Sequence, residues 1–192
     1  MDSLELLVHP VRLRIVHAMS GGQALTTAQL CARMPDVSKA TVYRHVELLT
    51  SGGILEVDSE QRVRGAVERH YRLRRERAVI DADTAASASK DDHRRIFAAA
   101  MATLLAEFST YLDRDEAHPT EDMVGYRQHA VWLDHDEVVE LISDMRAAIV
   151  PRLKNAPAPG RSQYLLSPIM FPIDQSNATT ETTAARNTDK PN

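Results

Sequence analysis

The sequence predicts a mainly α-helical protein with small β elements. Two observations lead to this fold class. Apolar residues recur at helical spacing over residues 4–20 and again over residues 92–113. Apolar and polar residues alternate over residues 67–73, which is the period of a half-buried strand. Because 43% of the 192 residues are apolar and only 5% are aromatic, we expect a largely aliphatic core.

The first 35 residues predict two helices, separated by the glycine pair at 21–22. The first should begin near Pro10, because proline fits the first turn of a helix. Thr26 and Gln29 have the spacing of a capping box, so a second, short helix should begin there and end at Pro35. The apolar positions at helical spacing over residues 4–20, a pattern broken once at Pro10, are Leu4, Leu7, Val8, Val11, Ile15 and Met19.

The stretch from residue 37 to residue 55 predicts a third helix. Ser38 should cap it by accepting a backbone N–H bond, and the glycine pair at 52–53 should end it, because glycine adopts positive φ without strain. Three apolar residues at i, i+4 and i+7 should share its buried face, namely Val42, Val46 and Leu49. A helix, a short turn and a second helix form an arrangement that DNA-binding proteins place in the major groove.

The polar residues near the start of this third helix are the candidate DNA contacts. Arginine binds guanine through two hydrogen bonds and lysine binds guanine or phosphate, which favours Arg44 and Lys39. The others could reach phosphates or base edges, but His45, beside Val46, could instead be a neutral core histidine. An ordinary exposed helix face is the simpler alternative. The candidates are Ser38, Lys39, Thr41, Tyr43, Arg44 and His45.

Residues 54–73 predict a two-stranded hairpin, or wing. The polar stretch at 58–61 is interpreted as a turn region, and Arg62 and Arg64 should give the hairpin a basic tip. There they could reach phosphates or the minor groove, unless the tip is simply a solvated turn. The arginine run at 72–77 could graze the DNA backbone or remain a solvated charge run.

Charge divides the chain into a basic N-terminal and an acidic C-terminal part. Residues 1–77 contain 12 Lys and Arg against 9 Asp and Glu, whereas residues 78–192 contain 11 against 18. This asymmetry favours a nucleic-acid-binding module joined to a part with another role. We expect a winged helix-turn-helix DNA-binding domain at 1–78, a linker at 79–91, a dimerisation and possible effector-binding domain at 92–174, and a disordered tail at 175–192.

The C-terminal part predicts an α+β dimerisation domain. Its long first helix has an apolar stripe broad enough to cover its own domain and a partner helix. Candidate strands at 126–133 and 162–173 flank a second helix, which a capping box at Asp134 and Glu137 should begin. Trp132 could line an effector cavity, although core packing is its commoner role. The stripe consists of Phe97, Met101, Leu104, Leu105, Phe108 and Leu112.

Other classes of protein find little support in the sequence. We find no Gly-x-Ser-x-Gly, phosphate-binding glycine loop or His-Glu-x-x-His motif, so we expect neither an enzyme nor a cofactor. Cys31 is the single cysteine, which excludes an internal disulfide. Without a signal peptide or an apolar run of about 20 residues, a cytoplasmic protein that does not enter membranes is expected.

Three motifs resemble those of ArsR-like winged helix-turn-helix regulators. Leu7–Val16 is similar to their opening helix, Ser38–Leu55 to their recognition helix and its exit, and the segments 62–65 and 68–71 to the wing of one branch. The resemblance covers about residues 4–75. It implies a bacterial transcriptional regulator that binds operator DNA as a homodimer.

The resemblance does not extend to the metal-sensing branch. The metal sensors of the family often carry a cysteine pair on the helix before the turn, where this chain has Cys31 alone. Other members use Asp and His ligands on the terminal helices, but the residues available for this form no i, i+4 ligand pair. We therefore expect no metal, and interpret these residues as solvated surface and helix caps: Asp91, Asp92, His93, His118 and His135.

Together these features predict a regulator whose partners are double-stranded DNA and a second copy of the chain. Two recognition helices in successive major grooves, about 34–36 Å apart, would cover a promoter, so a repressor is expected. The C-terminal part could also bind a small-molecule effector, or it could only dimerise. The alternative function is a winged-helix protein-interaction module without specific DNA binding.

Overall fold

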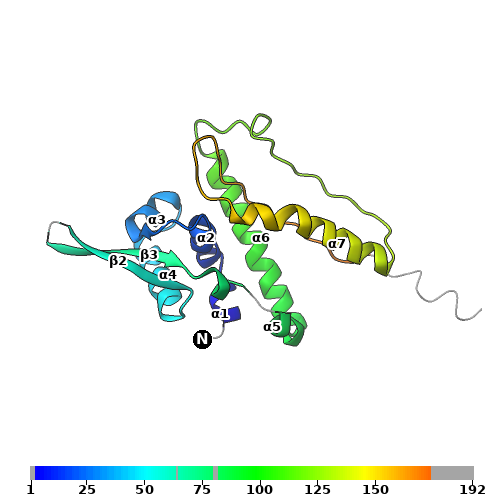
Figure 1. Ribbon diagram of the computed structural model, residues 1–192, viewed down its shortest axis with the longest axis horizontal. Helices are drawn as coiled ribbons and strands as arrows, with labels where there is room; N and C mark the ends of the chain where they lie inside the picture. Colours follow the sequence, from blue (N-terminus) through cyan, green and yellow to red (C-terminus); the bar gives the residue numbers. More distant parts are fainter. Residues whose placement is uncertain (1–2, 64, 80–81, 174–192) are drawn as a thin grey trace, which may run out of the picture.

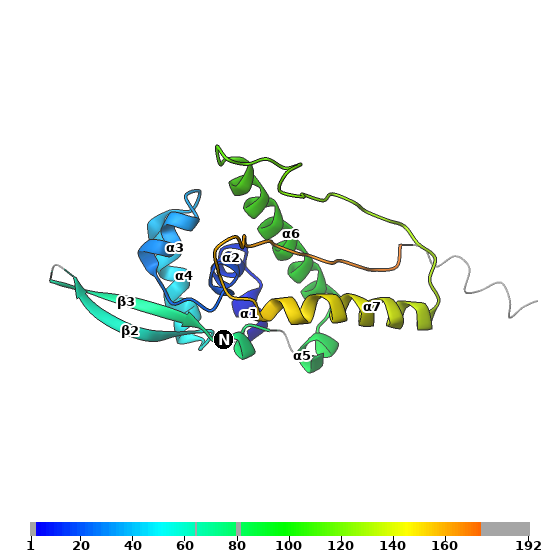
Figure 2. The same ribbon diagram turned by 45° about the horizontal axis from the view of Figure 1, so that its top comes forward.

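The computed structural model describes residues 3–63, 65–79 and 82–173 (Figure 1). A helical body bears a long hairpin that projects at one end of the molecule. Helix α6 lies in the middle, and α7 extends away at the other end (Figures 1 and 2). Two predictions, the DNA contact at Arg64 and the tail at 175–192, fall outside the described residues.

The helical body begins with α1 (Ser3–Leu7), α2 (Pro10–Met19), α3 (Thr27–Arg33) and α4 (Lys39–Ser51). The predicted start of α2 at Pro10 is confirmed, and the Nδ1 of the preceding His9 accepts a bond from the Val11 N–H at 3.2 Å. The predicted capping box of α3 is also confirmed. The Gln29 N–H donates to Thr26 Oγ1 at 3.2 Å, and the Thr26 N–H donates to Gln29 Oε1 at 2.9 Å.

A three-stranded antiparallel sheet completes the body, in the order β1-β3-β2. Strand β1 (Leu25–Thr26) pairs with β3 (Ala66–Leu73), and β3 pairs with β2 (Leu55–Val63) as the predicted hairpin. The expected turn at 58–61 is wrong, because these residues lie within β2: Asp58 sits at a register shift, and residues 59–61 pair with β3 beyond it. These polar residues are exposed residues of a two-stranded hairpin. Their polarity therefore reflected exposure to solvent and did not indicate a turn.

An aliphatic core joins α1–α4 to the base of the sheet. The predicted buried face of α4 is confirmed, and Gly52 allows α1 to approach the end of that helix, since a Cβ at this position would lie 2.2 Å from Leu6 Cδ1. The core residues are Leu6, Leu7, Ile15, Met19, Leu25, Leu30, Met34, Val42, Val46, Leu49, Ile54, Leu55 and Leu73.

The segment that follows the sheet contains more helix than expected. The predicted linker at 79–91 includes α5 (Ala82–Ser87) and the first residues of α6 (Lys90–Leu112). Its small residues are mostly alanine, which favours helix, and Ser89 begins α6 through a capping box with Asp92. Helix α6 packs against α2 through the face that contains Ala99 and Thr103.

The last described part consists of α7 (His135–Ile149) between two extended segments. The predicted capping box is confirmed: the Glu137 N–H donates to Asp134 Oδ1 at 2.9 Å. The strands predicted at 126–133 and 162–173 are wrong, because neither segment pairs with a neighbouring strand in the described chain. Trp132 packs into neither a core nor a cavity, since its side chain is 76% exposed.

The chain returns from α7 to the helical body. A short 3-10 helix, η2 (Val150–Lys154), follows α7 directly. The side chain of Gln163 then donates to the His17 carbonyl at 2.8 Å and to Ser20 Oγ at 3.1 Å. Arg75 also donates to the Ser20 carbonyl, so the end of α2 meets residues from both the wing base and the C-terminal segment.

Candidate nucleic-acid interface

Helix α4 presents its polar face because its cap and its buried face fix its orientation. The Thr41 N–H donates to Ser38 Oγ at 3.3 Å, and the Ser38 and Thr41 hydroxyls lie 2.8 Å apart. Val42, Val46 and Leu49 hold the opposite side of the helix in the core. The first turn therefore faces outward, with the unpaired N–H groups of a helix N-terminus available to an anion.

The exposed polar and aromatic residues of this helix, before its last residue Ser51, are Lys39, Tyr43, Arg44 and Glu47. Their spacing of three and four residues places them side by side on one surface strip. Lys39 and Arg44 have no ion-pair partner within the described part of the chain, so their charges remain available to a ligand.

The expectation that His45 contacts DNA is wrong, because its side chain is 2% exposed and lies in the core. Its ring lies 4.3 Å from that of His9, centroid to centroid, and both its nitrogens lack a hydrogen-bond partner among the described residues. Burial, and then the charges of His9, Arg12 and Arg44, lower the pKa of His45 to about 4. At neutral pH His45 is therefore an uncharged core residue, which was the alternative interpretation.

Positive charge gathers beside the exposed strip of α4. Arg12 is almost fully buried, and its guanidinium donates to the Glu5 carbonyl at 2.7 Å. Its burial and the nearby charge of Arg44 lower the pKa of Arg12, and burial with the charges of both arginines lowers the pKa of His9. This local excess of positive charge favours an anionic ligand near Arg44.

The wing offers one described candidate at its tip. Arg62 is exposed and pairs in register with Val67, next to the turn that follows Val63. No ion pair engages Arg62 among the residues that the structure describes. The hairpin projects well beyond the helices of the body, so its tip is placed to reach a partner that α4 also contacts (Figures 1 and 2).

The arginines along the rest of the wing are paired within the chain. Three ion pairs link β3 and the residue after it to carboxylates of β2: Arg69–Glu60 at 2.8 Å, Arg72–Asp58 at 2.7 Å and Arg74–Glu56 at 2.6 Å. Arg75 donates to backbone carbonyls. The basic run at 72–77 is therefore largely used by the fold, which supports the solvated or structural interpretation of these residues over a DNA contact.

Sequence reasoning missed Glu47, which shares the exposed strip of α4 with Lys39 and Tyr43. Its spacing from these residues, at i+8 and i+4, is a signal that could have found it. A glutamate in this position can accept a hydrogen bond from the amino group of cytosine, and it repels phosphate. Glu47 is thus suited to discriminate between bases and does not add to the affinity for DNA of any sequence.

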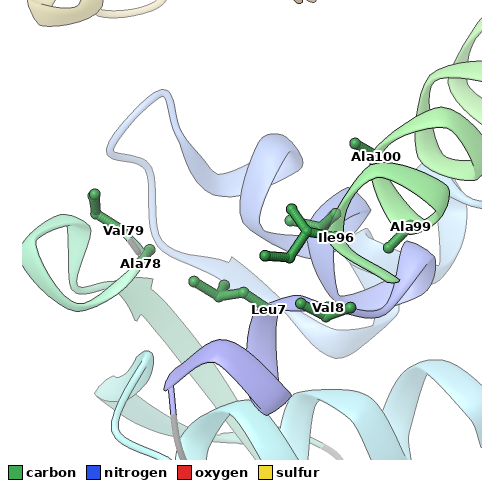
Figure 3. Close-up of a pocket in the computed structure, with 8 residues that line it drawn as sticks. Leu7, Val8, Ala78, Val79, Ile96, Ala99 and Ala100 are labelled. Carbon is green, nitrogen blue, oxygen red and sulfur yellow. The ribbon is translucent and has the colours of Figure 1, made fainter. Parts of the chain in front are cut away.

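A second feature lies between α1, α2, the segment that follows the wing and α6. An apolar hollow of about 340 Å³ is lined there by Leu7, Val8, Leu13, Ala78, Val79, Ile96, Ala99 and Ala100 (Figure 3). Figure 3 shows Leu7 and Ile96 turned toward each other across it. The described residues contain no group of three or more His, Cys, Asp or Glu side chains that could hold a metal ion.

The comparisons with known proteins agree with this arrangement for the first part of the chain. A family model described as a helix-turn-helix domain matches residues 7–58, which run from the end of α1 into β2. No curated protein matches the chain. This match supports a helix-turn-helix domain within residues 7–58. Together with the three-stranded sheet, whose strand β3 follows this range, it fits a winged helix, and such a domain suggests a DNA-binding regulator. None of the helices in the described ranges is long and apolar enough to cross a membrane.

Proposed function

We propose that this protein is a sequence-specific, DNA-binding transcriptional regulator of the ArsR-like type, which acts as a homodimeric repressor. The observation that supports this most strongly is the exposed strip of α4, where Lys39 and Arg44 are unpaired beside a helix N-terminus. By contrast, three arginines of the wing, Arg69, Arg72 and Arg74, are paired with carboxylates within the chain.

In this proposal α4 enters the major groove. Arg44 and Lys39 bind guanine edges or phosphates, and Tyr43 packs against the backbone or a base. Glu47 favours cytosine on the paired strand. Arg62, at the projecting wing tip, binds phosphates of the neighbouring groove, which adds affinity with little sequence preference.

A second copy of the chain is proposed to cover the C-terminal part. The apolar stripe predicted on α6 is not buried by the described chain: Phe97, Leu105 and Leu112 remain exposed. They lie on the side of α6 opposite Ala99 and Thr103, which pack on α2. Exposed apolar side chains on one face of a long helix are typical of an interface, and a two-fold axis there would repeat α4 for a palindromic operator.

Repression follows from steric exclusion in this proposal, since a dimer bound across a promoter prevents access to it. In this proposal a small-molecule effector would act by changing the geometry of the dimer. The hollow beside α6 is an apolar space at the junction between the helix-turn-helix body and this helix (Figure 3). We propose neither a metal, a cofactor nor a catalytic activity.

The test is a pull-down of fragmented genomic DNA followed by sequencing. The native protein should enrich a small number of inverted-repeat sites, and the double variant Lys39→Ala, Arg44→Ala should lose them. The matched control is Lys90→Ala, Arg94→Ala, which removes the same charge from α6, away from α4. This control should retain the sites, and the affinity of the native protein should fall steeply with salt, because phosphate contacts release counterions.

Two results would contradict the proposal. Equal losses in both double variants would mean that net charge, and not the α4 strip, drives binding. No enrichment by the native protein, with no dependence of retention on salt, would favour the protein-interaction module instead.

A further inference from the structure

Arg14 lies at the centre of the contact between the helix-turn-helix body and α6. Its side chain is only 2% exposed, although it is charged. Its guanidinium donates to both carboxylate oxygens of Asp36, at 2.5 and 2.8 Å, and to Glu107 Oε1 at 3.1 Å and Thr110 Oγ1 at 3.1 Å. One buried cation thus joins residues that are 22 and 93 positions away in the chain.

Asp36 belongs to the turn that sets the position of the candidate recognition helix. The Val37 N–H, next in the chain, donates to the Met34 carbonyl at 3.1 Å, and Ser38 then caps α4. The fork of Arg14 on Asp36 holds this turn from the α2 side. A displacement of Arg14 would therefore be felt first at the N-terminus of α4, where Lys39 lies.

Glu107 and Thr110 belong to α6, on the face that packs against α2. With Ala99 and Thr103 they recur at helical spacing, and Thr103 is fully buried where its hydroxyl approaches the Pro10 carbonyl at 3.5 Å. The exposed apolar stripe lies on the opposite side of α6. One helix therefore offers a possible partner surface on one side and two oxygen ligands for Arg14 on the other.

We propose that Arg14 is a positioning residue that couples α6 to the turn before α4, so that a shift of α6 changes the affinity of α4 for DNA. The affinity part of this inference rests on the proposed function, whereas the coupling itself does not. A buried guanidinium needs its partners, because removing one leaves charge and donors unsatisfied in the interior. When α6 moves, Arg14 must follow Glu107 or lose that bond, and Asp36 moves with it.

The pKa shifts of Arg14 and Asp36 agree with an ion pair that stays charged at neutral pH. The hydrogen bond to Asp36 raises the pKa of Arg14, and the same bond lowers the pKa of Asp36. Both groups thus remain ionised through the neutral range. The contact between them therefore depends on the position of α6 and not on a change of pH near neutrality.

The experiment compares Glu107→Gln with Asp91→Asn in the full chain. Both remove one carboxylate charge from α6, but Asp91 is exposed and pairs only with the neighbouring Arg94 among the described residues. Amide hydrogen exchange is measured in the free protein for residues 36–42, with Val46 and Leu49 in the core half of α4 as the internal reference. Affinity for an enriched DNA site is then measured for both variants.

Glu107→Gln should speed exchange at residues 36–42 severalfold, up to about tenfold, relative to the reference, because the Gln amide oxygen can still accept from Arg14 but the charge that strengthens this hydrogen bond is lost. It should also weaken DNA binding severalfold, while Asp91→Asn changes neither quantity. If Glu107→Gln leaves exchange at 36–42 unchanged, or speeds all of α4 equally, the coupling is refuted. If exchange changes but the native protein binds no DNA, the coupling stands and the proposed function fails.

Discussion

The two ends of this molecule differ in what holds them together. In the N-terminal region, residues 3–79, four helices and a sheet enclose thirteen buried hydrophobic side chains. In the C-terminal region, residues 104–173, no side chain is buried, although α7 is well capped and amphipathic. Both regions contain large apolar side chains such as leucine, isoleucine and methionine. The contrast shows that capping and spacing suffice to specify a helix, while burial requires a second surface.

The C-terminal region touches the rest of the chain at only a few points. Glu107 accepts a hydrogen bond from Arg14 at 3.1 Å, Gln163 donates to the His17 carbonyl at 2.8 Å, and Phe171 lies edge-on to Phe97 of α6 with ring centroids 6.3 Å apart. Helix α7 itself buries nothing in the described chain. An amphipathic helix of this length draws most of its stability from packing, so the contrast supports the proposed second copy.

The largest expected effect comes from truncating the same residue type in each region. Leu49→Ala should lower the free energy of unfolding by about 2–5 kcal/mol, because Leu49 is fully buried. Leu141→Ala, where the side chain is 37% exposed, should cost little in dilute solution and more as protein concentration rises and a dimer forms. Urea unfolding at two protein concentrations measures both. Equal, concentration-independent losses would show that the two regions are stabilised alike.

A charge on the exposed stripe of α6 should have the next largest effect. Leu105 is 68% exposed in one copy, and Leu105→Asp would bury a charge in the proposed interface. We expect the dimer dissociation constant to rise at least about tenfold, as measured by sedimentation equilibrium. Ala102→Asp places the same charge on the same helix, outside the stripe, and should leave association unchanged. If the native protein sediments as a monomer, the proposed dimer is refuted, and the exposed apolar surface of the C-terminal region would need another partner.

A smaller effect is expected from the buried histidine of the N-terminal region. The pKa of His45 is about 4, below its ordinary value of 6.5, so the unfolded chain binds its proton first as pH falls. The stability due to neutral His45 is complete above about pH 6.5 and is lost between there and pH 4. Urea unfolding from pH 7.5 to 4.5 should therefore show a shallower loss for His45→Leu than for the native chain. His129→Gln, at an exposed C-terminal position, should keep the native slope.

The smallest effect should come from the wing. The Arg69–Glu60 pair is half exposed on both sides, so water screens it. Glu60→Gln should change the free energy of unfolding by no more than about 0.5 kcal/mol in urea denaturation. A loss above 1 kcal/mol would mean that these cross-strand pairs, and not the core at the hairpin base, hold the wing in place.

Local signals predicted α2, α3, α4, α6 and α7 but missed α5, which lies in the expected linker. The starts at Pro10 and Asp134, the capping box at Thr26 and the hairpin after Gly53 depend on neighbours within four or five residues. The strands predicted at 126–133 and 162–173 failed, because a strand exists only where another strand offers hydrogen bonds. The candidate interface was partly predicted in the same way: Lys39 and Arg44 are exposed as expected, while His45 turned inward.

The sequence by itself determined where the helices begin and end, which side of α4 is apolar, and that the first half of the chain carries the basic surface. These properties depend on spacing and capping, which act over a few residues. Only the tertiary structure decided that His45 is buried, that the wing pairs its own arginines and that Arg14 links Asp36 to α6. Contacts between residues about 90 positions apart leave no periodic trace in a single sequence, because their partners meet only when the helices pack.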